Sequence, residues 1–156
     1  MDEGHAEDLI KQLAGTPAAF ESALARLGEE GFEKRPAETE WSALEVLQHV
    51  RASDYIISSR VWNALVRGDA VYPGLDEVRY LELLQRAALP PREVLTAFAI
   101  RRRELVGLLG DLAHEEWATV ITTDFGSADL RERCSRLLEH ELEHFGQLNA
   151  IVAQLA

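Results

Sequence analysis

The chain has 156 residues, a length typical of one domain with a substantial core, which excludes a two-domain enzyme. Hydrophobic residues make up 47% of it and charged residues 28%, so the chain is expected to fold. A formal net charge of −11 argues against nucleic acid and anionic membranes as partners. The single cysteine excludes an internal disulfide and a cysteine-rich zinc site. The acidic N-terminus and the lack of a long apolar run predict a cytoplasmic protein.

The first predicted helix ends at a break over residues 28–41. Its large apolar residues fall on one stripe at helical spacing, namely Leu9, Leu13, Phe20, Leu24 and Leu27. The stripe keeps its phase across Pro17, although proline inside a helix removes a backbone hydrogen bond. One bent helix and two nearly collinear helices therefore fit the pattern equally well.

The second helix is predicted to begin at Trp41 and Ser42 and to run to about Val66. Ser42 and Glu45 have the spacing of a capping box, in which each residue satisfies a backbone N–H of the other. A break over residues 67–76 follows, where glycine and proline interrupt the helical pattern.

Three further helices complete the pattern. They are a short connecting helix over Glu77–Leu89, a third long helix from Pro90-Pro91 to about Gly110, and a fourth from Ser127 or Asp129 to the C-terminus. The segment Thr119–Phe125 comes closest to a strand, but it is short and isolated. The sequence thus predicts an all-α fold, a single four-helix-bundle domain over residues 1–156 with an extra helix between the second and third long helices.

The stretch His140-Glu141-Leu142-Glu143-His144 is the most informative motif of the chain. Histidines at i and i+4 lie on one helix face, from which both imidazoles can reach one metal ion. The H-E-x-x-H string also suggests a zinc protease, in which a third ligand follows downstream. The twelve residues after His144 contain no histidine, aspartate or glutamate, so the protease interpretation lacks its third ligand.

His49 is the natural third ligand, because it lies well inside the second predicted helix. Three histidines from two facing helices, with positions left for water or substrate, are typical of a catalytic metal site. The alternative is that these histidines are ordinary surface or packing residues.

Together these features resemble the DinB/YfiT-like metalloprotein family. The resemblance rests on Trp41-Ser42 at a helix start, on His49 seven positions after Ser42, and on the string His140-Glu141-x-x-His144-x-Gly146-Gln147-Leu148. It implies a bundle with up-down-down-up connectivity, a metal held by His49, His140 and His144, and a homodimer. Similar proteins include S-transferases and isomerases that use low-molecular-weight thiols. The resemblance also makes Gln147 a candidate for orienting a ligand or a bound water.

Three charged residues fall on apolar stripes. On the third long helix Arg102 lies within the stripe formed by Val94, Phe98, Leu105 and Leu109, while Asp54 and Glu141 share the apolar stripes of their own helices. Because a buried charge needs a partner, Arg102 is predicted to pair with Asp54 or Glu141 in the core. The alternative is that Arg102 meets an anionic group of a substrate beside the metal.

The remaining candidates have structural interpretations. Cys134 is expected to be a small buried hydrophobic residue rather than a nucleophile. The three tryptophans are expected to be core or interface anchors, and they are Trp41, Trp62 and Trp117.

The leading hypothesis is a metal-dependent enzyme acting on a small molecule. Three imidazoles favour a divalent transition ion such as zinc or nickel, which lowers the pKa of bound water or of a low-molecular-weight thiol. Hydrolysis, thiol transfer and thiol-assisted isomerisation all remain open. The alternative is a non-catalytic dimeric bundle that binds a metal or a small ligand, and an open or a closed pocket at the histidines distinguishes the two.

Overall fold

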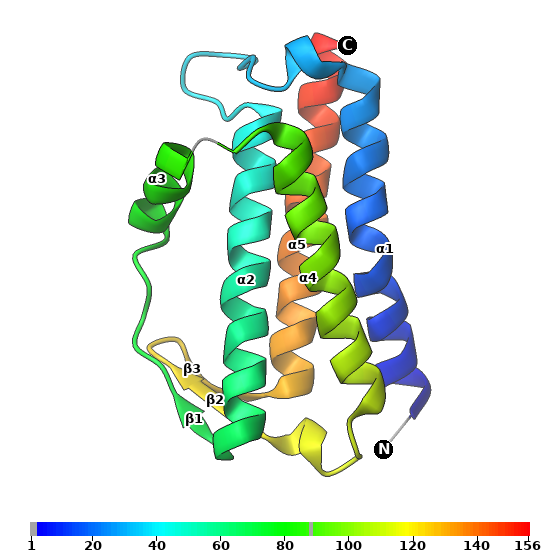
Figure 1. Cartoon of the computed structure of the whole chain (residues 1–156), viewed down its shortest axis with the longest axis vertical. Helices are drawn as coiled ribbons and strands as arrows, with labels where there is room; N and C mark the ends of the chain where they lie inside the picture. Colours follow the sequence, from blue (N-terminus) through cyan, green and yellow to red (C-terminus); the bar gives the residue numbers. More distant parts are fainter. Residues whose placement is uncertain (1–2, 88) are drawn as a thin grey trace.

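The computed structural model describes residues 3–87 and 89–156, which form a helical bundle with a small sheet at one end (Figure 1). The long helices are α1 (Glu3–Leu27), α2 (Ala43–Arg67), α4 (Pro91–Asp111) and α5 (Leu130–Leu155), and the short helix is α3 (Glu77–Ala87). In Figure 1 α1 and α5 run upward while α2 and α4 run downward. The predicted four-helix bundle with up-down-down-up connectivity is therefore confirmed.

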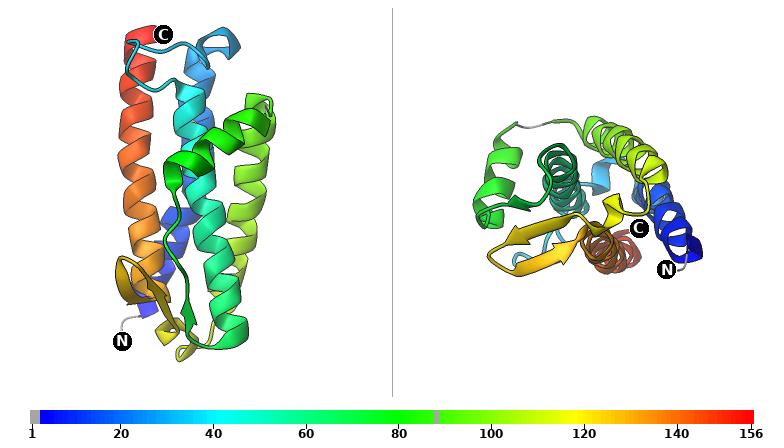
Figure 2. Two further views of the ribbon diagram at one scale, coloured as in Figure 1. Left: turned by 90° about the vertical axis from the view of Figure 1, so that its left-hand side faces the viewer. Right: turned by 90° about the horizontal axis from the view of Figure 1, so that it is seen from below.

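Each of α1 and α2 packs against both α4 and α5, so the four long helices surround one core. The end-on view in Figure 2 shows this arrangement, with α3 outside the bundle against α2. The connecting helix α3 ends at Ala87, two residues before the predicted end, and residue 88 lies outside the described residues. No helix in the described part of the chain is long and apolar enough to cross a membrane.

The ends of α2 and α5 are set by local sequence. The backbone N–H of Glu45 donates to the Ser42 hydroxyl (3.2 Å), and the Ser42 N–H donates to the Glu45 carboxylate (2.8 Å), which confirms the capping box. Asp129 caps α5 by accepting from the Glu132 N–H (2.8 Å). The first helix is one continuous element through Pro17, which decides between the two alternatives.

A three-stranded sheet closes one end of the bundle, where the sequence predicted at most one isolated strand. Its members are β1 (Ala70–Val71), β2 (Val120–Thr123) and β3 (Gly126–Asp129), with β1 parallel and β3 antiparallel to β2. Ile121 of β2 is buried against the helices, and the Arg133 side chain from α5 donates to the carbonyls of Ile121 (2.9 Å) and Gly126 (2.6 Å). Tertiary contacts stabilise these strands, which are too short to show a clear sequence pattern.

The core consists of two apolar halves separated by a polar layer. One half contains Leu13, Val61, Leu105 and Leu137, and the other contains Phe20, Val50, Phe98 and Leu148. Between these residues lie buried polar side chains from all four long helices, namely Thr16, Asp54, Ser58, Arg102 and Glu141. The polar layer therefore lies across the middle of the bundle.

Candidate metal centre

Three histidines from two antiparallel helices meet in the upper half of the bundle. His49 lies about two turns into α2, and His140 and His144 lie one turn apart on α5. The Nε2 atoms of His49 and His140 are 2.9 Å apart, and one ring nitrogen from each histidine lies within 4.8 Å of the other two. Nitrogen ligands on one zinc ion are about 3.3 Å apart, so these three imidazoles fit a single divalent ion.

The environment of His140 favours its neutral form. Burial lowers the pKa of His140, and the nearby charge of His144 lowers it further. A neutral imidazole has a lone pair to offer, which metal binding requires. Its Nδ1 is buried and has no hydrogen-bond partner among the described residues.

Gln147 fixes the orientation of His144. The Nδ1 of His144 lies 2.8 Å from the Gln147 Oε1. Since an amide oxygen only accepts, Nδ1 carries the proton of this hydrogen bond, and in the neutral ring Nε2 has the lone pair. Gln147 is thus the kind of neighbour that fixes the tautomer and the ring plane of a metal ligand.

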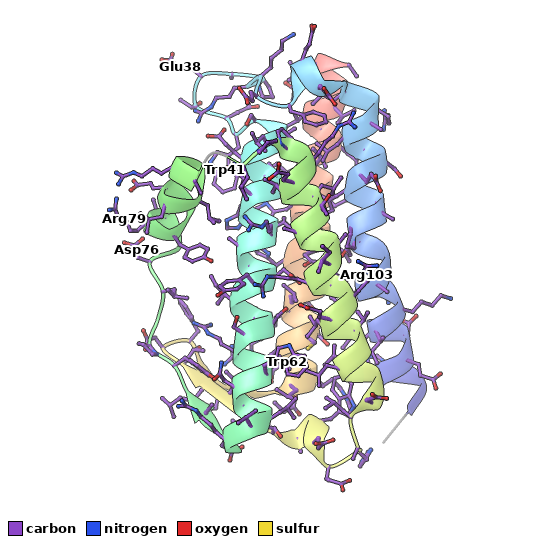
Figure 3. The ribbon with its side chains drawn as sticks, in the orientation of Figure 1. Glu38, Trp41, Trp62, Asp76, Arg79 and Arg103 are labelled. Atoms are coloured by element: carbon purple, nitrogen blue, oxygen red, sulfur yellow. The ribbon has the colours of Figure 1, made fainter. Side chains whose placement is uncertain are left out.

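Trp41 forms an aromatic wall beside the histidines. Its ring lies nearly parallel to that of His144, with an interplanar angle of 12° and centroids 6.1 Å apart, and its centroid is 5.1 Å from that of His49. Figure 3 labels Trp41 beside the first turns of α2. From the sequence, Trp41 was expected to be a core or interface anchor at the start of a helix. Its place directly before Ser42, about two turns from His49, was the signal for a role at this site.

An open groove adjoins His144. Its volume is about 410 Å³, and besides His144 and Trp41 it is lined by Thr39, Glu40, Gln147, Ala150, Ile151 and Gln154. This volume lies in the range of small-molecule sites. The histidine cluster therefore adjoins, through His144, a space that a substrate-sized molecule can enter.

Arg102 is enclosed in the polar layer and is only 1% exposed. Its Nη1 donates to the Leu13 carbonyl (2.8 Å), the Thr16 hydroxyl (2.6 Å) and Glu141 (2.9 Å). Its Nη2 donates to Asp54 (2.7 Å) and Glu141, and its Nε also donates to Asp54 (3.2 Å). Arg102 points inward, as helical phase predicted. Its contacts support the interpretation that Arg102 pairs with carboxylates in the core rather than with an anionic substrate.

Burial dominates the electrostatics of this polar layer. It raises the pKa of both Asp54 and Glu141, and the charge and hydrogen bonds of Arg102 only partly offset that effect. Burial by itself lowers the pKa of Arg102, but the hydrogen bonds and charges of Glu141 and Asp54 outweigh it and leave the pKa raised. One guanidinium thus faces two carboxylates, and the Oδ2 atom of Asp54 has no partner among the described residues.

Glu141 points away from the histidines that flank it in sequence. Its carboxylate binds Arg102 and accepts from the Thr16 hydroxyl (2.8 Å), and the side chain is fully buried. The H-E-x-x-H string therefore does not place a general base beside the metal ligands, as a zinc protease requires.

The remaining candidates lie away from the histidines. Cys134 is buried in the core, and burial raises the pKa of its thiol to about 12, as expected for a packing residue. Trp117 is buried under the sheet end of the bundle, whereas Trp62 on α2 is 46% exposed (Figure 3).

Solved structures with this architecture include two proteins of Bacillus subtilis. One is YfiT, described as a probable metal-dependent hydrolase with an unusual four-helix bundle topology; its TM-score is 0.87 at 15% identity, covering 97% of this chain and 87% of that chain. The other is the DinB-like protein YjoA, with a TM-score of 0.64 at 17% identity over 94% of this chain and 90% of that chain.

A third similar structure is a mycothiol-dependent maleylpyruvate isomerase. Its TM-score is 0.74 at 14% identity, and the alignment covers 92% of this chain but only 60% of the isomerase. At these identities the likeness shows the fold alone. None of the curated proteins matches the sequence. The family model for the DinB superfamily matches residues 12–148, and the chain therefore belongs to the DinB superfamily.

Proposed function

We propose that this protein is a metal-dependent enzyme acting on a small molecule, with His49, His140 and His144 holding one divalent transition ion. The observation that carries the proposal is the convergence of three imidazoles beside an open groove of substrate size. A closed structural site surrounds its ion with four protein ligands and leaves no such opening.

The chemistry follows from the donor set. Three imidazole nitrogens favour zinc or nickel over magnesium or calcium. A divalent ion held there lowers the pKa of water or of a low-molecular-weight thiol, so that a nucleophile is present near neutral pH. The similar structures described as a probable metal-dependent hydrolase and a mycothiol-dependent isomerase are consistent with both nucleophiles.

The chain itself positions these groups. Gln147 would hold the His144 ring with Nε2 free to bind the ion, and the Trp41 ring lies beside two of the histidines, His49 and His144. The polar layer below fixes the rotation of α5, on which two of the ligands lie.

Metal content tests the proposal most directly. We expect purified protein to hold about one zinc or nickel ion per chain by elemental analysis, and His140→Ala to abolish tight binding. His114→Ala is the matched control, because His114 is exposed and outside the cluster. A His140→Ala variant that binds metal as tightly as the parent would contradict the site.

Catalysis needs a second measurement, because a non-catalytic metal-binding bundle would also pass the first. We expect the metal-loaded protein, and not His140→Ala, to accelerate either hydrolysis of nitrophenyl acetate or conjugation of small thiols to monochlorobimane. Metal binding without either activity would favour the non-catalytic alternative.

We also propose that two chains form a homodimer, with exposed apolar helix surface at the contact. Trp62 is the tryptophan that fits this role, since Trp117 is only 6% exposed. Light scattering should then give twice 17.4 kDa, and Trp62→Glu should shift the protein toward the single-chain mass. A parent protein of 17.4 kDa at micromolar concentration would contradict the dimer.

A further inference from the structure

The groove beside His144 is lined by two segments that are far apart in the sequence. Thr39, Glu40 and Trp41 come from the segment before α2, and the other lining residues come from the last turns of α5. Figure 2 shows this segment beside the C-terminal part of α5 at one end of the bundle. A molecule in the groove therefore lies directly against His144.

The position of Glu40 in this segment is held by backbone hydrogen bonds. The Glu40 N–H donates to the Ala37 carbonyl (3.0 Å), closing a turn, and two residues later the capping box at Ser42 starts α2. The nearest cation of the same segment, Arg35, pairs with Glu45 and donates to the Glu38 carbonyl (3.2 Å). Arg35 lines a different groove, and its partners among the described residues are Glu45 and the Glu38 carbonyl.

The charges of the groove are one-sided. Glu40 is its carboxylate, and no lysine or arginine among the described residues lines it. Arg102, the cation that could have met an anionic substrate, is enclosed in the polar layer. At the Glu40 side of the groove, away from the ion proposed at the histidines, an anionic group would therefore face a carboxylate and no lysine or arginine among the described lining residues, in a protein whose net charge is −11.

A tryptophan and a carboxylate that line the same groove form a combination that can bind organic cations. The ring quadrupole and the negative charge both attract an ammonium group, while an anion is repelled by both. We propose that this groove binds a protonated amine of the substrate, with Glu40 selecting its charge and Trp41 forming the aromatic wall. This inference rests on the proposed function, because the reacting part of the same molecule would reach the histidine cluster.

The whole chain is tested after a chelator has removed any bound metal, because an ion at the histidines would itself bind butyrate. Three probes of the same shape and different charge are titrated, namely butylammonium, butanol and butyrate, and the indole N–H signals are followed by NMR. Trp41→Phe identifies the Trp41 signal among the three tryptophans. We expect a saturable shift of that signal with butylammonium, a weaker effect with butanol and none with butyrate.

Glu40→Gln should weaken butylammonium binding by about twofold to fivefold, the range expected for exposed cation–π and ion-pair contacts. Glu38→Gln removes the same charge two residues away, outside the groove, and should leave the affinity unchanged. Equal weakening in both variants would mean that the net charge of the protein attracts the cation, and equal binding of butyrate would mean that the groove is indifferent to charge. Either result overturns the inference.

The proposed function fails on a separate measurement. A parent protein that takes up no metal contradicts the metal-dependent function, whatever the probes do. A protein that takes up metal but binds butyrate as well as butylammonium contradicts the charge selection alone.

Discussion

Arg102 and Glu141 form a two-point ion pair between α4 and α5, with Nη1 2.9 Å from Oε2 and Nη2 bound to Oε1. A bidentate pair fixes direction as well as distance. Because Glu141 follows His140 directly, the pair that fixes Glu141 also fixes where His140 points on the same helix. The polar layer thus connects the packing of the core to the geometry of the candidate metal centre.

Removing the cation of this layer should be costly. We expect Arg102→Met to lower the free energy of unfolding by about 3 to 5 kcal/mol, because two buried carboxylates lose their partner. Urea unfolding followed by circular dichroism measures the change. Arg103→Met is the matched control, since Arg103 is the next residue and is exposed. Equal unfolding midpoints for the two variants would contradict the role of the ion pairs.

The raised pKa of Asp54 predicts a particular pH dependence. A carboxyl whose pKa is higher in the folded than in the unfolded protein binds its proton more tightly in the folded state. Protonated Asp54 therefore stabilises the fold at low pH, and this contribution is lost as the pH rises above the ordinary aspartate pKa of 3.8 and through the raised pKa of the folded protein. Asp54→Asn removes that contribution and keeps the oxygen that accepts from Arg102. We therefore expect the variant to lose less stability than the parent between acid and neutral pH.

Urea midpoints measured at several pH values test this expectation. Glu139→Gln removes an exposed carboxylate from α5 and is the control for the loss of one negative charge. If the urea midpoints of the parent and Asp54→Asn changed with pH in parallel, Asp54 would have the same pKa in the folded and unfolded protein, which contradicts the prediction.

Gln147 should act on metal affinity through His144. We expect Gln147→Leu to weaken binding by about tenfold or more, as loss of a ligand-orienting hydrogen bond commonly does. Gln147→Glu keeps an acceptor for Nδ1–H and should retain most of the affinity. Competition with a coloured chelator gives the affinities. Gln154→Leu changes the same groove and serves as the control, so an equal loss there would argue for a packing effect.

The thiol of Cys134 should be unreactive in the folded protein. Burial and a pKa of about 12 keep it protonated and inaccessible, so iodoacetamide should modify it only on unfolding. Arg136→Cys places a second thiol at an exposed site of the same helix and should react quickly in the native state. Modification of Cys134 at the rate of the exposed thiol would mean that this part of the core opens readily.

Local sequence determined most of the fold. Helical spacing of apolar residues predicted the four long helices, the Ser42–Glu45 capping box set the start of α2, and helical phase placed Arg102 inside the bundle. The sheet escaped prediction because β1 has two residues and depends on pairing with β2 about 50 positions away. Such a strand is stabilised by long-range contacts, which leave no periodic pattern in the chain.

The sequence also selected the three histidines, from the i and i+4 spacing of His140 and His144 and from the position of His49 in a capped helix. Only the tertiary structure brought Trp41 and Glu40 to the same groove as Gln147, and only it paired Arg102 with both carboxylates. The physical reason is that spacing fixes which residues share a helix face, whereas the meeting of faces depends on how separate helices and loops pack.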